Sequence, residues 1–274
     1  MDVLSADWVG ICRRIVAAQR ELFDATPGIE ARTEYEGVGE GGDCSLVIDR
    51  RCEDVVFAEL ERLAAEGASF VAVSEERGEV AFGAGGPARV VIDPIDGSLN
   101  ARRTLPSHSL SIAVASGGSM ADVELGYVYD FGAGEEFTAA RGEGAKRAGN
   151  PIGVGADGEK LELLGIESAA PGRMLPLEQA LDGRVFRFRV IGSIAISAAY
   201  VAAGRLDGML SLRPCRSVDI AAAQLIVREA GGEVEFGSLP LERAGLGLDA
   251  RYPIAAAAGE RGLGLIRNAM GEAV

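Results

Sequence analysis

The chain has 274 residues, of which 48% are hydrophobic and 25% charged, and its formal net charge is −14 at pH 7. The length allows a substantial core, and the composition is typical of a soluble globular protein. The negative charge argues against a nucleic-acid backbone or an anionic membrane as partner, and no apolar run approaches the roughly 20 residues that a membrane span needs.

The first half of the chain mixes helical and strand-like patterns. Apolar residues recur at helical spacing from Ser5 to about Ala25 and from about Arg50 to Glu66. A glycine-rich acidic loop and five short strand-like runs make up the rest, at residues 37–42, 69–74, 88–93, 110–115, 124–130 and 136–140. We therefore expect residues 1–150 to form an α+β half that contains an antiparallel meander.

The second half begins where the composition turns to Gly, Pro and Asp, around residues 150–159. Beyond this point, predicted strands alternate with predicted helices, at residues 161–167, 173–182, 185–191, 193–204, 206–212 and 219–230. This alternation predicts an α/β half over residues 151–274.

Residues 91–100 read Val-Ile-Asp-Pro-Ile-Asp-Gly-Ser-Leu-Asn and are the most informative segment of the chain. A strand is expected to end at Asp93, because the preceding run is β-branched and Pro94 cannot donate a backbone hydrogen bond. A helix would begin after Gly97, with its free N–H groups directed back at Asp93 and Asp96. Such an arrangement holds a hard cation between carboxylates and a phosphate at a helix N-terminus. The alternative is an acidic turn without chemistry.

Two other acidic positions support the cation hypothesis. Glu75 and Glu76 follow an apolar strand, and Asp219 lies in the first turn of an apolar helix that is expected to stop at Gly231. Taken singly, each has a simpler interpretation: a solvated strand end for the glutamates and a helix cap for Asp219.

Taken together, these three motifs resemble the inositol monophosphatase superfamily of magnesium-dependent phosphatases, over residues 8–260. The segments Ser211-Leu-Arg-Pro and Phe188-Arg-Val-Ile-Gly-Ser, and Ser98 itself, are most similar to the archaeal-type bifunctional fructose-1,6-bisphosphatase/inositol-1-monophosphatases. The resemblance implies an α/β fold, a layered αβαβα sandwich, with the active site between the two halves.

The resemblance also implies a set of metal ligands for two or three Mg²⁺ ions, for which Mn²⁺ can substitute. Glu75, Asp93 and the Ile95 carbonyl would hold the first ion, and Asp93, Asp96 and Asp219 the second. Magnesium prefers oxygen ligands, which these residues supply.

Asp49 matches the family's third-metal position, where it would activate water together with Glu75 and Ser98. The sequence alone favours Asp49 as the N-cap of a helix that starts at Arg50, a role compatible with metal binding, and Ser98 has a helix cap as its alternative. Many members of the family carry a lysine in the loop before Asp49, whereas residues 37–44 contain none, which puts the affinity for a third metal, and lithium sensitivity, in question.

The remaining site residues would bind substrate. By resemblance, Asp96 and the Gly97 and Ser98 amides would hold the cleaved phosphate. Substrate-facing positions of the archaeal subgroup are matched by a second set, Arg189, Gly192, Ser193 and Arg213. Arginine binds phosphate in a bidentate way, which suits a second phosphate group, although surface arginines that pair with acidic residues are the alternative.

The function that follows is hydrolysis of sugar phosphates by metal-activated water, from fructose-1,6-bisphosphate to fructose-6-phosphate and from inositol-1-phosphate to inositol. Two alternatives stay open, a 3′-phosphoadenosine nucleotidase and a catalytically inactive sugar-phosphate-binding homologue. Four scattered cysteines and a single histidine argue against a zinc site or a His-based triad and fit a cytoplasmic protein. The resemblance further implies a homodimer.

Overall fold

The computed structural model describes residues 2–33, 35–38 and 44–272. The described residues contain seven α-helices: α1 (Trp8–Ala25), α2 (Val47–Ala65), α3 (Ser98–Arg102), α4 (Pro171–Leu181), α5 (Ile194–Ala202), α6 (Ser217–Glu229) and α7 (Glu260–Glu272). Among these residues, no helix combines the length and the apolar character needed to cross a lipid bilayer.

The larger sheet has eight strands, which come from the first half of the chain. In chain order they are β3 (Phe70–Ser74), β4 (Gly78–Phe82), β5 (Arg89–Asp96), β6 (Ser109–Ala115), β7 (Val123–Asp130), β8 (Glu135–Ala140), β9 (Ala145–Arg147) and β10 (Asn150–Pro151). Their order in the sheet is β10-β9-β8-β7-β6-β5-β3-β4. All neighbours are antiparallel except β3 and β5, which run parallel, so the carboxyl ends of these two strands meet at one edge.

The smaller sheet has five strands in the order β12-β11-β13-β17-β15. They are β11 (Leu161–Glu167), β12 (Val185–Arg189), β13 (Gly208–Ser211), β15 (Glu233–Glu235) and β17 (Ala255–Ala257). Two short pairs complete the fold, β1 (Tyr35–Val38) with β2 (Cys44–Leu46) and β14 (Cys215–Arg216) with β16 (Arg251–Tyr252). Strand β11 runs parallel to both of its neighbours, β12 and β13, as the βα alternation predicts.

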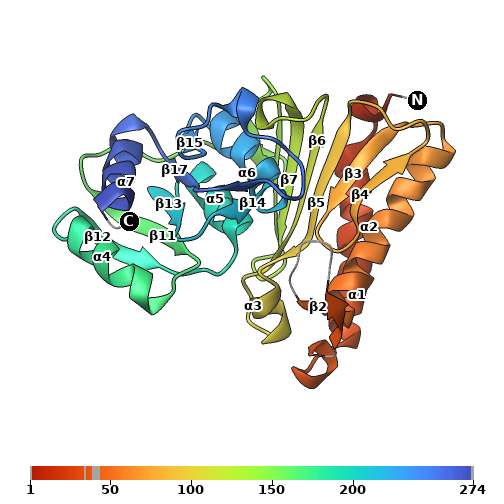
Figure 1. The fold of residues 1–274 in the computed structure, drawn as a ribbon, viewed down its shortest axis with the longest axis horizontal. Helices are drawn as coiled ribbons and strands as arrows, with labels where there is room; N and C mark the ends of the chain where they lie inside the picture. Colours follow the sequence, from red (N-terminus) through yellow and green to blue (C-terminus); the bar gives the residue numbers. More distant parts are fainter. Residues whose placement is uncertain (1, 34, 39–43, 273–274) are drawn as a thin grey trace.

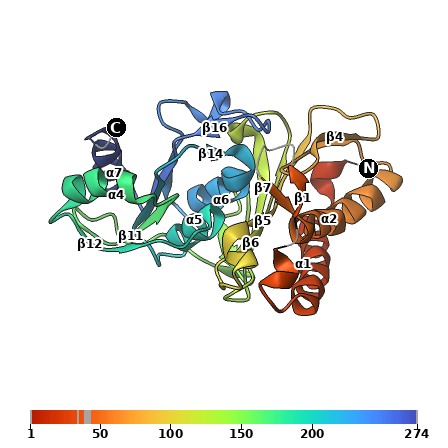
Figure 2. The ribbon, with the colours of Figure 1, turned by 60° about the horizontal axis from the view of Figure 1, so that its bottom comes forward.

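Five layers stack across the molecule. Figures 1 and 2 show α1 and α2 outside the larger sheet, α5 and α6 between the two sheets, and α4 and α7 outside the smaller sheet. Strand β6 is buried along its whole length because helices cover both faces of the larger sheet. The predicted αβαβα sandwich is confirmed.

Helix α6 packs closely against the larger sheet, and this contact brings the first turn of the helix close to strand β5. All of its residues from Ser217 to Val227 are buried. A Cβ atom at Gly126 of β7 would lie 2.4 Å from the carbonyl oxygen of Ala222, so only glycine allows this approach. The largest hydrophobic cluster therefore combines residues of both halves of the chain. The division at residue 150 stays a prediction.

The structure corrects two local expectations. Helix α2 begins at Val47, not at Arg50, so Asp49 lies inside its first turn and is not its N-cap. Strand β5 does not end at Asp93: it passes through Pro94 and continues to Asp96, with an irregular register between the two aspartates. Proline is tolerated there because a bulge removes the need for its N–H in the ladder. The loop predicted at residues 37–42 lies largely outside the described residues.

Candidate active site

The two aspartates of residues 91–100 lie at the end of β5, in the centre of the molecule. Asp93 is paired with Ser111 of β6 and Asp96 with Ser109, so two residues intervene on β5 where one intervenes on β6. The extra residue forms a bulge that turns both carboxylates away from the regular ladder. The backbone N–H of Ile95 donates to Asp93 Oδ1 at 3.0 Å and fixes the first carboxylate.

Gly97 makes the turn from β5 into α3. Its φ of +90° is strained for any residue with a side chain, and a Cβ there would lie 2.9 Å from the carbonyl oxygens of Gly192 and Ser107. Ser98 then begins α3, with Gly97 as the N-cap. The predicted strand, turn and helix are present, but the cap is Gly97 and not Ser98.

Side chains from three other segments meet the end of β5. A cavity of about 100 Å³ is lined by Asp49, Glu75, Glu76, Pro94, Ile95, Ser98 and Arg216. Glu75 reaches it because β3, which precedes it, runs parallel to β5. The proposed water-activating residues, Asp49 and Ser98, therefore face one cavity. Glu76 Oε2 is buried and has no hydrogen-bond partner among the described residues.

Asp219 and Arg216 complete the cluster from the start of α6. The Arg216 backbone N–H donates to Asp219 Oδ2 at 2.8 Å, and its Nε donates to Asp219 Oδ1 at 3.3 Å. The same guanidinium forms an ion pair with Glu75. Sequence reasoning missed Arg216, although its position three residues before Asp219 at a helix start allows such a contact.

Burial and mutual repulsion shift the ionisation of these carboxylates. Burial, followed by the charges of Glu75, Asp96 and Asp219, raises the pKa of Asp93 well above its ordinary value. Burial also raises the pKa of Glu75 to about 8, although Arg216 opposes the shift.

Asp96 shows the same effect, because burial and then Asp219 raise its pKa to about 7. The hydrogen bonds that Asp96 accepts, from Ser193 Oγ at 2.5 Å and from the Ala195 N–H at 2.7 Å, partly offset this increase. These buried carboxylates therefore gain from any added positive charge.

The donor set fits divalent cations of the magnesium type. All of its members supply oxygen, and positive charge among them would stabilise the ionised forms that burial disfavours. Within residues 2–33, 35–38 and 44–272, no group of three or more His, Cys, Asp or Glu side chains is already arranged as a metal site. Two of the expected ligands, Glu75 and Asp219, instead contact Arg216.

The predicted substrate residues fall into two groups. Ser193 lies against Asp96, and Gly192 packs against the turn at Gly97, so both adjoin the carboxylates. Arg189 is exposed at the end of β12, and Arg213 is exposed and lines a different cavity, of about 240 Å³. The structure thus does not bring Arg213 into the carboxylate cavity, and its role stays a prediction.

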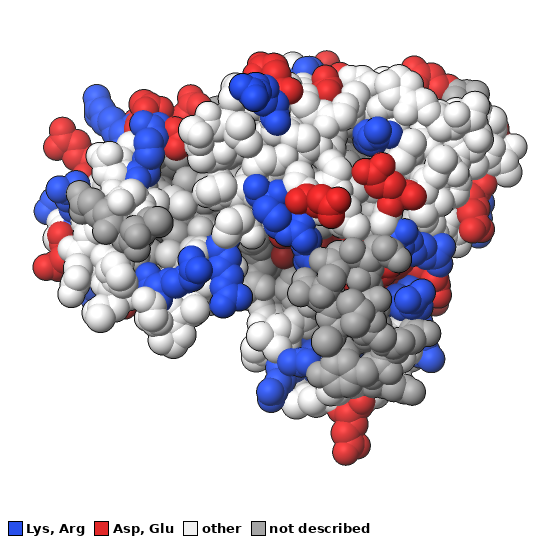
Figure 3. Space-filling view, viewed as in Figure 1, with Lys and Arg blue, Asp and Glu red and all other residues white. Residues whose placement is uncertain are grey.

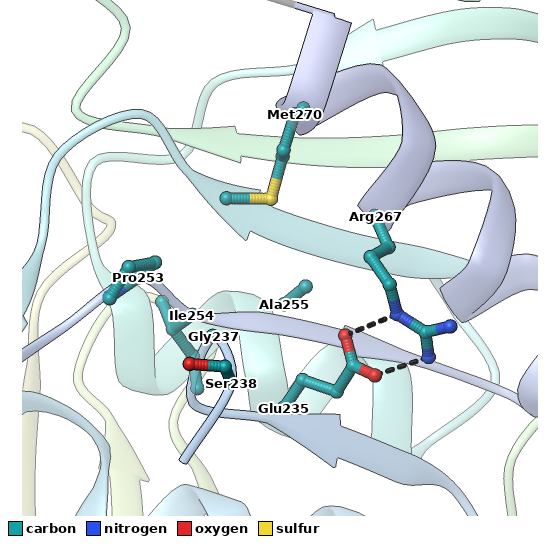
Figure 4. Close-up of a pocket in the computed structure, with 9 residues that line it drawn as sticks. Glu235, Gly237, Ser238, Pro253, Ile254, Ala255, Arg267 and Met270 are labelled. Carbon is teal, nitrogen blue, oxygen red and sulfur yellow. Dashed lines mark hydrogen bonds and ion pairs between the residues drawn. The ribbon is translucent and has the colours of Figure 1, made fainter. Parts of the chain in front are cut away.

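A larger cavity, of about 540 Å³, holds none of the predicted site residues. Figure 4 shows it beside the ion pair between Glu235 and Arg267, with Pro253, Ile254 and Met270 forming an apolar wall. On the face drawn in Figure 3, acidic and basic side chains are interspersed among uncharged areas. The candidate catalytic residues Asp49, Glu75 and Ser98 line the smaller cavity instead.

Comparisons with known proteins identify the family of the chain. A model described as the inositol monophosphatase family matches residues 11–263. A fructose-1,6-bisphosphatase/inositol-1-monophosphatase of Thermococcus kodakarensis is 34% identical over 265 residues, which cover 96% of this chain and 97% of that protein.

Two further similarities extend the comparison. A Nus factor SuhB of Pasteurella multocida is 41% identical over 153 residues, which cover 53% of this chain and 55% of that protein. Among solved structures, a crystal structure of an inositol monophosphatase-fructose 1,6 bisphosphatase superimposes with a TM-score of 0.84 at 26% identity, covering 96% of this chain and 100% of that one.

Proposed function

The chain belongs to the inositol monophosphatase family, and from that premise we propose that it is a magnesium-dependent phosphatase of fructose-1,6-bisphosphate and inositol-1-phosphate. One observation carries the proposal: Asp93, Asp96, Glu75 and Asp219 interact electrostatically at the end of β5, and Asp49 and Ser98 face the adjoining cavity. The similarity to archaeal-type bisphosphatases supports the choice of substrates.

The family resemblance implies the metal ligands, and the clustering of the carboxylates supports them. Glu75, Asp93 and the Ile95 carbonyl would hold one Mg²⁺ ion, and Asp93, Asp96 and Asp219 a second. When bound, such ions supply positive charge for the phosphoryl oxygens and lower the pKa of a coordinated water.

The chain's own groups would orient the reactants. Asp49 in the first turn of α2 and Ser98 at the start of α3 line the same cavity, where the carboxylate would accept a proton from a water that the hydroxyl holds. The backbone amides of Gly97 and Ser98 precede the first hydrogen-bonded turn of α3 and would bind the phosphoryl oxygens. Ser193 and Gly192 would then contact the sugar, while Arg189 and Arg213 would bind a second phosphate.

We also propose that the protein is cytoplasmic, which the scattered cysteines support, and a homodimer, as the resemblance implies. The negative charge continues to argue against a nucleic-acid partner, even though part of the chain is similar to Nus factor SuhB.

The test is phosphate release by the purified full chain, with Mg²⁺ or with EDTA. We expect Mg²⁺-dependent release from fructose-1,6-bisphosphate and inositol-1-phosphate, and little from 3′-phosphoadenosine 5′-phosphate. Preference for the adenosine substrate would favour the nucleotidase alternative. No release from any of the three would favour an inactive binding protein. An Asp93→Asn variant, purified in parallel, controls for contaminating phosphatases.

A further inference from the structure

Glu167 is a buried carboxylate outside the cluster just described. It ends β11 and is 2% exposed. Three donors surround it: Ser197 Oγ at 2.5 Å, the Gly192 N–H at 2.8 Å and the Ile191 N–H at 3.4 Å. None of the ion pairs within the described residues involves Glu167. Its interactions are thus directed at the turn formed by residues 191–193 and at the helix that follows.

A carboxylate in this position is costly for the fold. Burial raises the pKa of Glu167 to about 7, in spite of the hydrogen bonds from Ser197 and Gly192 that favour its ionised form. A neutral or apolar side chain would avoid the desolvation cost. A functional role for Glu167 would therefore depend on the hydrogen bonds that it accepts.

The turn at residues 191–193 is held from two sides. Glu167 binds its backbone N–H groups, while Asn100 Nδ2 donates to the Ile191 carbonyl oxygen at 2.8 Å and to the Ser107 carbonyl oxygen at 2.7 Å. Gly192 has a φ of +85°, and a Cβ there would lie 2.7 Å from Asn100 Nδ2. The turn consequently has little freedom to shift while its hydrogen bonds to Glu167 and from Asn100 are both present.

The last residue of the turn reaches the carboxylate cluster. Ser193 is 1% exposed, and its Oγ donates to Asp96 Oδ2 at 2.5 Å. The Ser193 Oγ also accepts the Ile196 N–H at 3.2 Å and so caps α5. The backbone N–H of Ala195, in the first turn of α5, donates to Asp96 as well. The orientation of Asp96 thus depends on where the turn and the start of α5 lie.

We propose that Glu167 is a positioning residue, which fixes the turn at residues 191–193 and, through Ser193, the orientation of the Asp96 carboxylate. The inference rests on the proposed function in so far as Asp96 is a metal ligand. The side-chain hydrogen bonds of Glu167 go to Ser197, Gly192 and Ile191 and to none of the proposed metal ligands. It acts on the site in the way that hydrogen-bonding partners behind a ligand commonly do, by restricting the ligand's orientation.

The first experiment measures Mn²⁺ affinity by electron paramagnetic resonance on the full chain. We expect Glu167→Ala to weaken Mn²⁺ binding by about 10- to 100-fold, the range found when such supporting partners are removed. Glu167→Gln should stay within about threefold of wild type, because its amide oxygen can still accept the Gly192 N–H and its NH₂ can donate to Ser197.

The matched control is Asp207→Ala. Asp207 Oδ2 accepts the backbone N–H groups of Glu162 and Leu163, at the other end of the same strand, at 2.5 and 2.9 Å. Its loss removes comparable hydrogen bonds from β11 without touching the turn. We expect Asp207→Ala to lower the melting temperature and to leave Mn²⁺ affinity unchanged. An equal loss of affinity in both variants would show that Glu167 is merely structural.

The second experiment needs no metal. Hydrogen–deuterium exchange of residues 191–197 should be faster in Glu167→Ala than in wild type and unchanged in Asp207→Ala. A wild-type protein that does not bind Mn²⁺ would overturn the proposed function, and the exchange measurement would then decide the role of Glu167 alone. Unchanged exchange in Glu167→Ala overturns the inference. If the wild type binds Mn²⁺, an unchanged Mn²⁺ affinity of Glu167→Ala overturns it as well.

Discussion

Arg216, which directly precedes α6, forms an ion pair with Glu75, which follows β3 and lies 141 residues earlier in the chain. The same side chain also contacts Asp219, so one guanidinium compensates two of the carboxylates expected to bind metal. If these carboxylates bind metal, as proposed, Arg216 and divalent cations would compete for the same oxygens. Arg216 would then be a determinant of metal affinity that the sequence motifs did not indicate.

Replacing Arg216 by methionine should separate its two effects. In EDTA, we expect Arg216→Met to lower the free energy of unfolding by about 3 kcal/mol, because a largely buried ion pair loses one partner and leaves carboxylates uncompensated. Mn²⁺ should bind more tightly, because a competing positive charge is gone. Thermal melts in EDTA and Mn²⁺ titrations measure the two quantities.

Arg141→Met is the control for Arg216→Met. Arg141 pairs with Glu124 at 3.0 Å on the surface, and an exposed pair contributes at most about 1 kcal/mol. This variant should change neither Mn²⁺ affinity nor, beyond that amount, stability. Weaker Mn²⁺ binding by Arg216→Met would contradict the competition and make Arg216 a support for the ligands.

Asp93→Asn should abolish activity while it stabilises the metal-free protein. Asp93 is 1% exposed, and both burial and the surrounding carboxylates raise its pKa, so its ionised form is unfavourable without metal. A neutral amide of the same size removes this cost, and the melting temperature in EDTA should rise at pH 8. If Asp93 bridges two metal ions, kcat should fall by far more than tenfold. Retention of more than about a tenth of wild-type kcat, a barrier change below about 1.4 kcal/mol, would show that Asp93 is not a shared ligand.

The stability of the metal-free protein should fall as the pH rises from about 4 to about 8. Glu75 and Asp96 have raised pKa values in the folded protein, about 8 and about 7, against ordinary values of 4.5 and 3.8. Over this window the folded state binds more protons than the unfolded state, and the slope of the free energy of unfolding against pH is then negative.

Denaturant melts at several pH values in EDTA measure this slope. Saturating Mg²⁺ should flatten it, because bound cations stabilise the ionised carboxylates in the folded state. A free energy of unfolding that rises between pH 5 and pH 8 in EDTA would mean that these carboxylates are already compensated in the folded protein.

The parts of the fold that depend on local patterns were predictable from the sequence. The β-branched run before Asp93, the turn at Gly97 and the apolar helix that begins near Asp219 are local features, and the structure contains all three. The layer order came from the family resemblance. Helix α7 escaped prediction because Gly262, Gly264 and Gly271 interrupt it, and glycine is a poor helix former.

The contacts that complete the site are of a different kind. Asn100 binds the carbonyl oxygen of Ile191, which lies 91 residues away, and Glu167 binds the same turn from another layer. Periodicity reports which face of an element is buried, but not which distant residue meets it there. Asp49 shows the same limit, since its place inside α2 depends on where the helix begins, and local rules determine helix boundaries poorly.

Arg213 separates a bisphosphatase from a simple monophosphatase. If Arg213 binds the phosphate that is not cleaved, Arg213→Ala should reduce kcat/KM for fructose-1,6-bisphosphate by roughly ten- to a hundredfold, because a charge-assisted contact contributes on the order of 1.5–3 kcal/mol. Inositol-1-phosphate has no second phosphate and should be hydrolysed almost normally. Arg213→Lys should recover only part of the loss, since an ammonium lacks the planar fork.

The position of Arg213 makes this prediction demanding. The side chain is exposed and lines a cavity with Arg173, apart from the cavity of the carboxylates, so a bound bisphosphate would have to extend from one to the other. The exposed Arg184 provides a control arginine, and Arg184→Ala should affect neither substrate. Equal losses on both substrates would make Arg213 a structural residue. No loss on either would leave it a solvated surface charge, and the second phosphate would then have to be bound by other groups, of which Arg189 is the first to test.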